Sequence, residues 1–264
     1  MPPKLIFIVP YRDRREHKLF FTKYMEYIME DYNKEDYEIY FSHQVDFRPF
    51  NRGAMKNIGF LAMKQKYSTD YNNITFVFHD VDTIPYKKNL LNYETTDGII
   101  KHFYGYEFAL GGIFSIKGKD FERVNGFPNM WGWSMEDNMI QQRILENGLK
   151  IDRNNFFKLG ARAILQFTDG ITKIINKKEV AGFLNKDYRH GLNSIKKLNY
   201  EISNEFINVE NFETETDANA QKYEKHDITQ KTSNKIRLTK EERYGGNNIA
   251  IGGFKNMGTL FKRK

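Results

Sequence analysis

The sequence has no cysteine among its 264 residues. This excludes disulfides, thiolate nucleophiles and cysteine-ligated metals, and it favours a reducing compartment over the secretory route. The sequence contains no run of about eighteen apolar residues, so it predicts no transmembrane helix. The first residues, MPPKLIFIVPYRDRR, lack the long apolar centre of a signal peptide and are better explained as a first strand. These absences predict a cytoplasmic protein.

Net positive charge is missing from most of the chain and concentrated near its end. Residues 222–264 hold eleven of the 41 Lys and Arg but only four of the 34 Asp and Glu. The first 221 residues are therefore electrically neutral, which argues against a nucleic-acid-binding protein as a whole. The basic tail predicts contact with a membrane surface or a polyanion.

Apolar strands alternate with amphipathic helices over the first eighty residues. The expected elements are strands at 4–10, 37–44 and 73–80, a helix at 14–32, and a helix that follows Asn51 as its N-cap. This alternation is typical of an α/β fold with a mainly parallel, Rossmann-like sheet flanked by helices. Ligands of such sheets collect at the carboxyl ends of the strands, which here carry PYRDRR, DFRPFNR and DVDTIP.

Regular patterns weaken toward the C-terminus. The later expected elements are a double-glycine strand at 108–116, a short helix and turn within 117–128, a helix from Glu136 to about Gly148, and one or two strands within 150–167. From Glu213 the chain turns polar and irregular. We therefore predict a folded body of residues 1–212 and a basic extension of residues 213–264, partly helical at best. The glycine-rich stretch at 245–258 has no lysine at the spacing of a phosphate-binding loop.

Two aspartates follow the third strand with one valine between them. Asp80 and Asp82 provide hard oxygen ligands, which suit Mg²⁺ or Mn²⁺ together with a diphosphate. The other explanation is a solvated turn, because Asp and Pro are common in loops. The pattern alone leaves both open.

A second acidic pair opens the helix in WGWSMEDN. Glu136 and Asp137 lie where the helix dipole favours carboxylates, and either could act as a general base toward a hydroxyl. Alternatively, Ser134 and Asp137 have the spacing of a capping box. Trp131 and Trp133 are either core residues or a platform for the apolar face of a sugar.

Arginines accompany these carboxylates at the strand ends. Arg12, Arg14 and Arg52 lie on the predicted ligand side, where a guanidinium can hold phosphate with two hydrogen bonds. Ion pairs of the first two with Asp13 and Glu16 are the alternative.

The motifs VPYRDRREH, FNRGAMKNIGF, FHDVDTIP, GGIFSI, NGFPNMWGWSMEDN and HGLNS occur in this order between Leu5 and Asn193. The series resembles the β-1,4-galactosyltransferase family, which are inverting GT-A glycosyltransferases that use UDP-sugars and Mn²⁺. The resemblance implies a GT-A nucleotide-diphospho-sugar transferase fold for residues 1–212.

The resemblance also implies roles for matching residues. Those in the positions that bind the nucleotide and donor sugar are Pro10, Tyr11, Arg12, Arg14, Phe50, Arg52, Asp80, Val81, Gly111, Gly112 and Trp133. Asp82 matches the direct metal ligand. Asp137 matches the base that deprotonates the acceptor, and Glu136 matches a residue that holds the donor sugar or acceptor.

Several positions depart from the family pattern. Ser134 and Met135 replace loop glycines, which predicts a bulkier and stiffer closing loop. Ala163 and Gln166 align with the family's Met and His metal ligands, so Gln166 is expected to be a weak ligand. Ala109 replaces a bulky residue beside the sugar C2 position and predicts room for an N-acetyl group.

The family's disulfides and membrane anchor are absent as well, which fits a bacterium or the cytoplasm of a virus-infected host better than the Golgi lumen. The predicted function is metal-assisted transfer of Gal, GalNAc or GlcNAc from a UDP-sugar to a glycan hydroxyl with inversion. Mn²⁺ or Mg²⁺ is the expected cofactor. The alternative is a catalytically impaired protein of the same fold that binds glycans or nucleotide sugars.

Overall fold

The structure is a computed structural model that describes residues 1–168, 170–184 and 189–229. Most of the basic tail, including the glycine-rich stretch at 245–258, lies outside the described residues. In the part of the chain that is described, no helix is both long enough and apolar enough to cross a bilayer.

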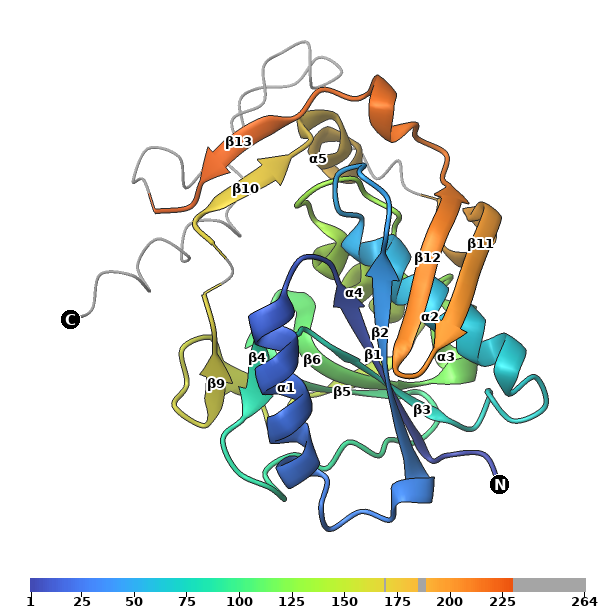
Figure 1. The fold of residues 1–264 in the computed structure, drawn as a ribbon, viewed down its shortest axis with the longest axis vertical. Coiled ribbons are helices and arrows are strands. Elements are labelled where there is room, and N and C mark those ends of the chain that lie inside the picture. Colours follow the sequence, from blue (N-terminus) through green and yellow to red (C-terminus); the bar gives the residue numbers. More distant parts are fainter. Residues whose placement is uncertain (169, 185–188, 230–264) are drawn as a thin grey trace.

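A nine-stranded sheet runs through the body of the protein (Figure 1). Its order is β11-β12-β2-β1-β3-β6-β5-β7, with β8 paired to β5. The strands are β1 Leu5–Tyr11, β2 Tyr37–Gln44, β3 Thr75–His79, β5 Ile99–Tyr106, β6 Ala109–Lys117, β7 Lys150–Asp152, β8 Phe157–Lys158, β11 Lys196–Ser203 and β12 Phe206–Glu213.

Most strand pairs in this sheet are parallel, as the sequence predicts. Strand β1 runs parallel to β2 and β3, β12 to β2, and β5 to both β7 and β8. Strand β6 is antiparallel to β3 and β5, and β11 is antiparallel to β12. Only Glu107 and Phe108 separate β5 from β6, and so short a connection can join only antiparallel strands.

Helices cover both faces of the sheet. They are α1 Arg15–Ile28, α2 Arg52–Lys66, α3 Gly118–Arg123 and α4 Glu136–Glu146. A further helix, α5 Lys177–Leu184, lies away from the sheet (Figure 1). Successive side chains of β1 point to opposite faces of the sheet, and every one of them is buried because both faces are covered. Phe7 belongs to the apolar cluster that includes α1, whereas Ile8 belongs to the cluster that includes α2 and α4.

Capping interactions were predicted at the starts of α2 and α4, and only the one at α2 is confirmed. Asn51 caps α2, because its side chain accepts a 2.9 Å hydrogen bond from the Ala54 amide. The capping box at α4 is wrong. Met135 occupies the N-cap without a side-chain hydrogen bond, and the Ser134 hydroxyl is buried without a partner.

Two small sheets lie beside the central one. Strands β4 Thr83–Pro85 and β9 Ile164–Gln166 pair antiparallel, and so do β10 Thr172–Ile175 and β13 Glu224–Asp227. We call the second pair the β10–β13 ribbon (Figure 1).

The fold continues past the predicted boundary at residue 213. Besides forming β13, this segment receives two hydrogen bonds from the Trp131 indole, at 3.0 Å to the Thr214 hydroxyl and 2.9 Å to the Thr216 carbonyl. Residues 213–229 are therefore part of the folded body.

Candidate active site

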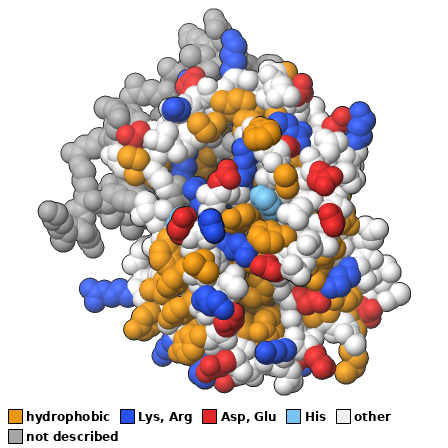
Figure 2. Space-filling view, in the orientation of Figure 1, with side chains coloured by type: hydrophobic (Ala, Val, Ile, Leu, Met, Phe, Trp, Pro, Cys, Tyr) orange, Lys and Arg blue, Asp and Glu red, His pale blue; other side chains and the backbone are white. Residues whose placement is uncertain are grey.

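Two pockets of about 590 Å³ each meet where β3 ends and α2 and α4 begin. The Gly111 pocket is lined by the double glycine, Ala109, Asp137 and Gln166, among others. The Arg14 pocket is lined by Pro10, Arg12, Arg14, Phe50 and Val81, among others. Five residues line both: Arg52, Asp80, Asp82, Trp133 and Lys173. The predicted strand-end segments therefore converge, and Figure 2 shows Lys and Arg side chains gathered around the hollow.

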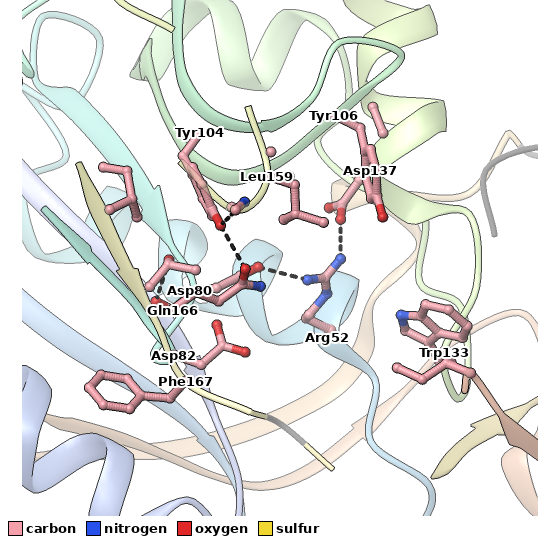
Figure 3. Close-up of a pocket in the computed structure, with 18 of the residues that line it drawn as sticks. Arg52, Asp80, Asp82, Tyr104, Tyr106, Trp133, Asp137, Leu159, Gln166 and Phe167 are labelled. Carbon is pink, nitrogen blue, oxygen red and sulfur yellow. Dashed lines mark hydrogen bonds and ion pairs between the residues drawn. The ribbon is translucent and has the colours of Figure 1, made fainter. Parts of the chain in front are cut away.

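Arg52, the first residue of α2, contacts three carboxylates. Its Nε donates to Glu136 Oε1 at 2.8 Å. Its Nη1 donates to Asp80 Oδ2 at 2.9 Å, and its Nη2 donates to Asp137 Oδ2 (Figure 3). One guanidinium therefore contacts Asp80 of the first acidic pair and both members of the second.

Lys56 completes this arrangement one helical turn later. Its ammonium lies 3.5 Å from Asp80 Oδ1 and 3.5 Å from Asp137 Oδ1, and its side chain is 1% exposed. We refer to Arg52, Lys56, Asp80, Glu136 and Asp137 as the Arg52 cluster. Lys56 was not predicted as a site residue. The feature that could have identified it is its position four residues after Arg52, on a helix face whose other residues are buried.

The charges within the Arg52 cluster stabilise one another. Burial disfavours the charge of Arg52, yet Asp137, Asp80 and Glu136 raise its pKa well above the ordinary value. Burial likewise disfavours the charge of Asp80, but Lys56 and Arg52 outweigh it and lower the pKa of Asp80.

Asp82 lies outside the cluster, and its pKa shifts in the opposite direction to that of Asp80. Burial, reinforced by the negative charge of Asp80, raises the pKa of Asp82 to about 6. The charge of Lys173 on β10 is the largest influence in the opposite direction, and burial lowers the pKa of Lys173 itself to about 8. Asp82 therefore faces both pockets as an incompletely neutralised carboxylate.

Gln166, the predicted weak metal ligand, is close in register to Asp82. It pairs with Thr83 across β4 and β9, and its Oε1 accepts a 2.7 Å hydrogen bond from the Tyr104 hydroxyl (Figure 3). Ala163 contributes only its carbonyl, which accepts from the Tyr86 amide at 2.8 Å. Among the described residues, no three His, Cys, Asp or Glu side chains group as metal ligands. The local donor set is thus one carboxylate and one amide oxygen.

The double glycine is required by close contacts. A Cβ at Gly111 would lie 2.5 Å from Asp137 Oδ2, so glycine leaves the space that this carboxylate occupies. Gly112 has a φ of +69°, and a Cβ there would lie 2.4 Å from the Tyr104 carbonyl oxygen. Glycine at both positions shapes the wall between β6 and α4.

The two tryptophans have different surroundings. Trp131 is fully buried and stacks on Phe212 at 5.3 Å, so it is a core residue. Trp133 lines both pockets, and its amide donates to the Ile174 carbonyl of β10 at 2.6 Å. Its ring lies 6.2 Å from that of His226 on β13. The β10–β13 ribbon therefore holds the loop that carries Trp133.

Two of the predicted nucleotide-site residues have other contacts. Tyr11 is not among the residues that line either pocket, and its ring packs edge-on against Phe41 and His43. Arg12 lines the Arg14 pocket but also pairs with Asp13 at 3.6 Å. Tyr223, from the predicted extension, lines the same pocket and was missed because its segment has no strong periodicity.

The central sheet and the pockets at its strand ends define the GT-A class of glycosyltransferase folds. Residues 2–94 match a family model described as the N-terminal region of glycosyl transferase group 7, and residues 100–165 match one described as the N-terminal domain of galactosyltransferase. The chain belongs to the β-1,4-galactosyltransferase family.

Curated relatives include β-1,4-galactosyltransferase 1 of mouse and β-1,4-galactosyltransferase 7 of Drosophila. The mouse protein is 33% identical over 58% of this chain and 40% of its own length. The Drosophila protein is 30% identical over 73% of this chain and 62% of its own length. The chain thus spans between about 40% and 62% of these two relatives.

Solved structures give the same family. The catalytic domain of Drosophila β-1,4-galactosyltransferase 7 in complex with xylobiose has a TM-score of 0.64 and 26% identity, covering 82% of this chain and 96% of that one. A variant of that enzyme in complex with manganese, UDP-Gal and xylobiose has a TM-score of 0.60 and 23% identity, with the same coverage.

Proposed function

We propose that this chain is a UDP-sugar-dependent glycosyltransferase that transfers a hexose or N-acetylhexosamine to a glycan hydroxyl with inversion. The observation that carries the proposal is the Arg52 cluster at the meeting of two pockets. Asp137 faces the Gly111 pocket, Glu136 faces the Arg14 pocket, and Asp82 faces both. A transfer reaction needs two substrates with their reacting atoms at one point, and this arrangement provides for them.

The Arg14 pocket suits the nucleotide diphosphate. Arg12 and Arg14 can hold phosphate oxygens, and Phe50 and Val81 offer apolar surface. The donor sugar then extends toward Gly111 and Gly112, where the absent side chains leave space beside Asp137. The named activity of the relatives supports the same assignment.

The residues present fit a divalent cation that is shared with the donor. Asp82 offers a carboxylate that lacks full neutralisation, and Gln166 offers a weaker amide oxygen. Mg²⁺ and Mn²⁺ are commonly held by one or two carboxylates together with substrate phosphates. When bound, the cation supplies positive charge to the departing diphosphate.

Asp137 is the proposed general base. The acceptor hydroxyl gives its proton to Asp137 while its oxygen forms a bond to the anomeric carbon of the donor. The bond from that carbon to the diphosphate oxygen breaks, and its electron pair leaves with UDP. Attack from the face opposite the leaving group inverts the anomeric centre. Glu136, 2% exposed and bonded to Arg52, orients the donor side.

Ala109 supports a broad donor range. It begins β6, lines the Gly111 pocket and carries only a methyl group. We therefore propose that UDP-GalNAc or UDP-GlcNAc is used at least as well as UDP-Gal.

A cytoplasmic location stays a prediction. Contact of the tail with a membrane or polyanion also stays a prediction, because residues 230–264 lie outside the described residues.

A UDP-release assay tests the proposed function. UDP-Gal, UDP-GalNAc, UDP-GlcNAc and UDP-Glc are each tested with xylobiose and with N-acetylglucosamine, with Mn²⁺, with Mg²⁺ and with EDTA. Acceptor-dependent UDP release that EDTA abolishes is the expected result. No turnover with any donor, together with tight UDP binding, would replace the enzyme by a binding protein. Strict use of UDP-Gal would reject the proposal on Ala109.

A further inference from the structure

Lys56 is a buried lysine that neither pocket explains. It is 1% exposed and is not among the residues that line the two pockets. Burying an ammonium group is costly unless carboxylates and other groups compensate for the lost water. Its compensation comes from Asp80, Asp137 and the ring of Phe127, whose centre lies 4.7 Å from Nζ. The position is therefore organised around these carboxylates rather than around solvent or a ligand.

Lys56 and Arg52 bind opposite oxygens of the same two carboxylates. Arg52 donates to Oδ2 of Asp80 and Oδ2 of Asp137, while Lys56 lies 3.5 Å from Oδ1 of each. Asp80 Oδ1 is otherwise buried without a hydrogen-bond partner. Since the cations are four residues apart on α2, both lie on one face of a rigid element.

We propose that Lys56 is a positioning residue that keeps the Asp137 carboxylate ionised and turned toward the Gly111 pocket. Arg52 alone holds one oxygen and leaves rotation about the Asp137 side chain possible, whereas a second cation on the other oxygen opposes it. This inference rests on the proposed function, in which Asp137 is the base. Lys56 acts through Asp137 and does not touch the substrate.

Several charged or titratable groups lie around Asp137. Arg52 and Lys56 come from α2, Asp80 follows β3, and Glu136 precedes Asp137 on α4. On β5, His102 Nε2 donates to the Gly111 carbonyl at 3.1 Å, and burial lowers the pKa of His102 to about 4, so it is neutral. Arg52 and Lys56 are the cations that contact Asp137, one at each carboxylate oxygen.

Lys56→Met is the first test, because methionine keeps the length of the side chain and removes its charge. We expect kcat to fall about tenfold or more, while the KM for the donor changes little. The acid limb of the kcat profile should move to higher pH by about one unit or more, because a neighbouring cation is lost. Lys56→Arg should restore the acid limb.

Lys64→Met is the matched control on the same helix. Lys64 also pairs with a carboxylate, that of Glu122, and lies 4.8 Å from the ring centre of Tyr71, but it is distant from both pockets. Its loss should leave kcat and the pH profile unchanged. A fall in kcat for Lys56→Met without a shift of the acid limb would overturn the inference.

A double variant tests whether Lys56 acts through Asp137. Adding Lys56→Met to Asp137→Asn should cause no further loss of activity, because the carboxylate that Lys56 positions is already gone. A further tenfold loss in the double variant would show that Lys56 serves another purpose and would reject the inference.

A titration without substrates separates this inference from the proposed function. The ¹³C-carboxyl signal of Asp137, identified by its absence in Asp137→Asn, is followed against pH in the wild type and in Lys56→Met. Ionisation at higher pH in the variant supports the inference even if no donor is turned over. Identical titrations would overturn it. If Lys56→Met does not fold, Lys56→Gln takes its place in every measurement.

Discussion

The two sides of the pocket junction differ in how completely the protein neutralises its own charges. In the Arg52 cluster, three carboxylates contact one guanidinium, and two of them also contact Lys56. On the other side, Asp82 has no such pair within the described part of the chain, and its pKa is raised to about 6. The first side is built before any ligand arrives. On the second side, a bound cation would neutralise the Asp82 carboxylate.

The supporting elements differ in the same way. The Arg52 cluster is placed by α2 with fifteen residues, α4 with eleven, and β3 in the middle of the central sheet. The Asp82 side is built by β4, β9 and β10, which have three or four residues each and belong to two-stranded sheets. Short two-stranded pairs are marginal by themselves. We therefore expect substitutions in the cluster to affect chemistry, and substitutions on the Asp82 side to affect ligand binding and stability.

The largest expected effect is that of Asp137→Asn. The amide keeps the shape of the side chain but cannot accept the acceptor proton, so kcat should fall about a thousandfold or more. Binding of UDP, measured by calorimetry, should stay within about threefold of the wild type, because Asp137 does not line the Arg14 pocket. Near-normal turnover would show that another group is the base.

Asp82→Ala should have the next largest effect and a different signature. Losing the carboxylate should remove the response of activity to added Mn²⁺ and reduce turnover by about a hundredfold or more. A Mn²⁺ titration of UDP release measures both. The control is Asp13→Ala, at the rim of the Arg14 pocket, which should keep the metal response. An unchanged metal dependence in Asp82→Ala would place the cation elsewhere.

Gly111→Ala tests whether the cluster depends on the shape of its wall. The new methyl would lie 2.5 Å from Asp137 Oδ2, so the carboxylate must move, and displacement of about 1 Å can cost about a hundredfold in rate. The thermal midpoint should change little, because the flexible end of a side chain can yield. Gly98→Ala is the control for activity alone, since a Cβ at Gly98 meets no described atom within 4 Å, whereas its φ of +73° should lower the thermal midpoint of that variant. Wild-type activity in Gly111→Ala would show that Asp137 does not need its present position.

The sequence predicted the side of the junction that rests on strong local patterns. The β2 boundaries, the Asn51 cap and the convergence of Arg52 with Asp80 follow from periodicity, capping and sheet topology. Asp137 was placed at the same site by the family resemblance. Lys56 was missed because a lysine within a helix ordinarily faces water, and only the tertiary structure shows its carboxylate partners.

The Asp82 side was less predictable because it depends on contacts between distant segments. Strands β10 and β13 pair residues about fifty positions apart, and their sequences, TKII and EKHD, have no alternation of apolar and polar residues. The folded segment at 213–229 was taken for an extension for this reason. Its contacts with Trp131 and with both pockets appear only when the strands are paired.

The smallest expected effect concerns Glu179, which joins α5 to the segment after β12. It is 7% exposed and accepts a 3.0 Å hydrogen bond from the Thr216 hydroxyl. Burial raises the pKa of Glu179 from 4.5 to about 7, so the folded protein binds this proton more tightly than the unfolded chain. The free energy of unfolding should therefore fall as pH rises from about 4.5 through 7 and level off above.

Glu179→Gln removes this charge and keeps the acceptor oxygen for Thr216. We expect the variant to be more stable than the wild type by about 1 kcal/mol at pH 8 and to lose that advantage at pH 5. Urea denaturation at both pH values measures the difference, and Glu201→Gln on the exposed part of β11 is the control. An equal stability difference at both pH values would mean that packing, rather than the charge of Glu179, limits this side of the molecule. Catalytic turnover should not change, because the Arg52 cluster is supported by other elements.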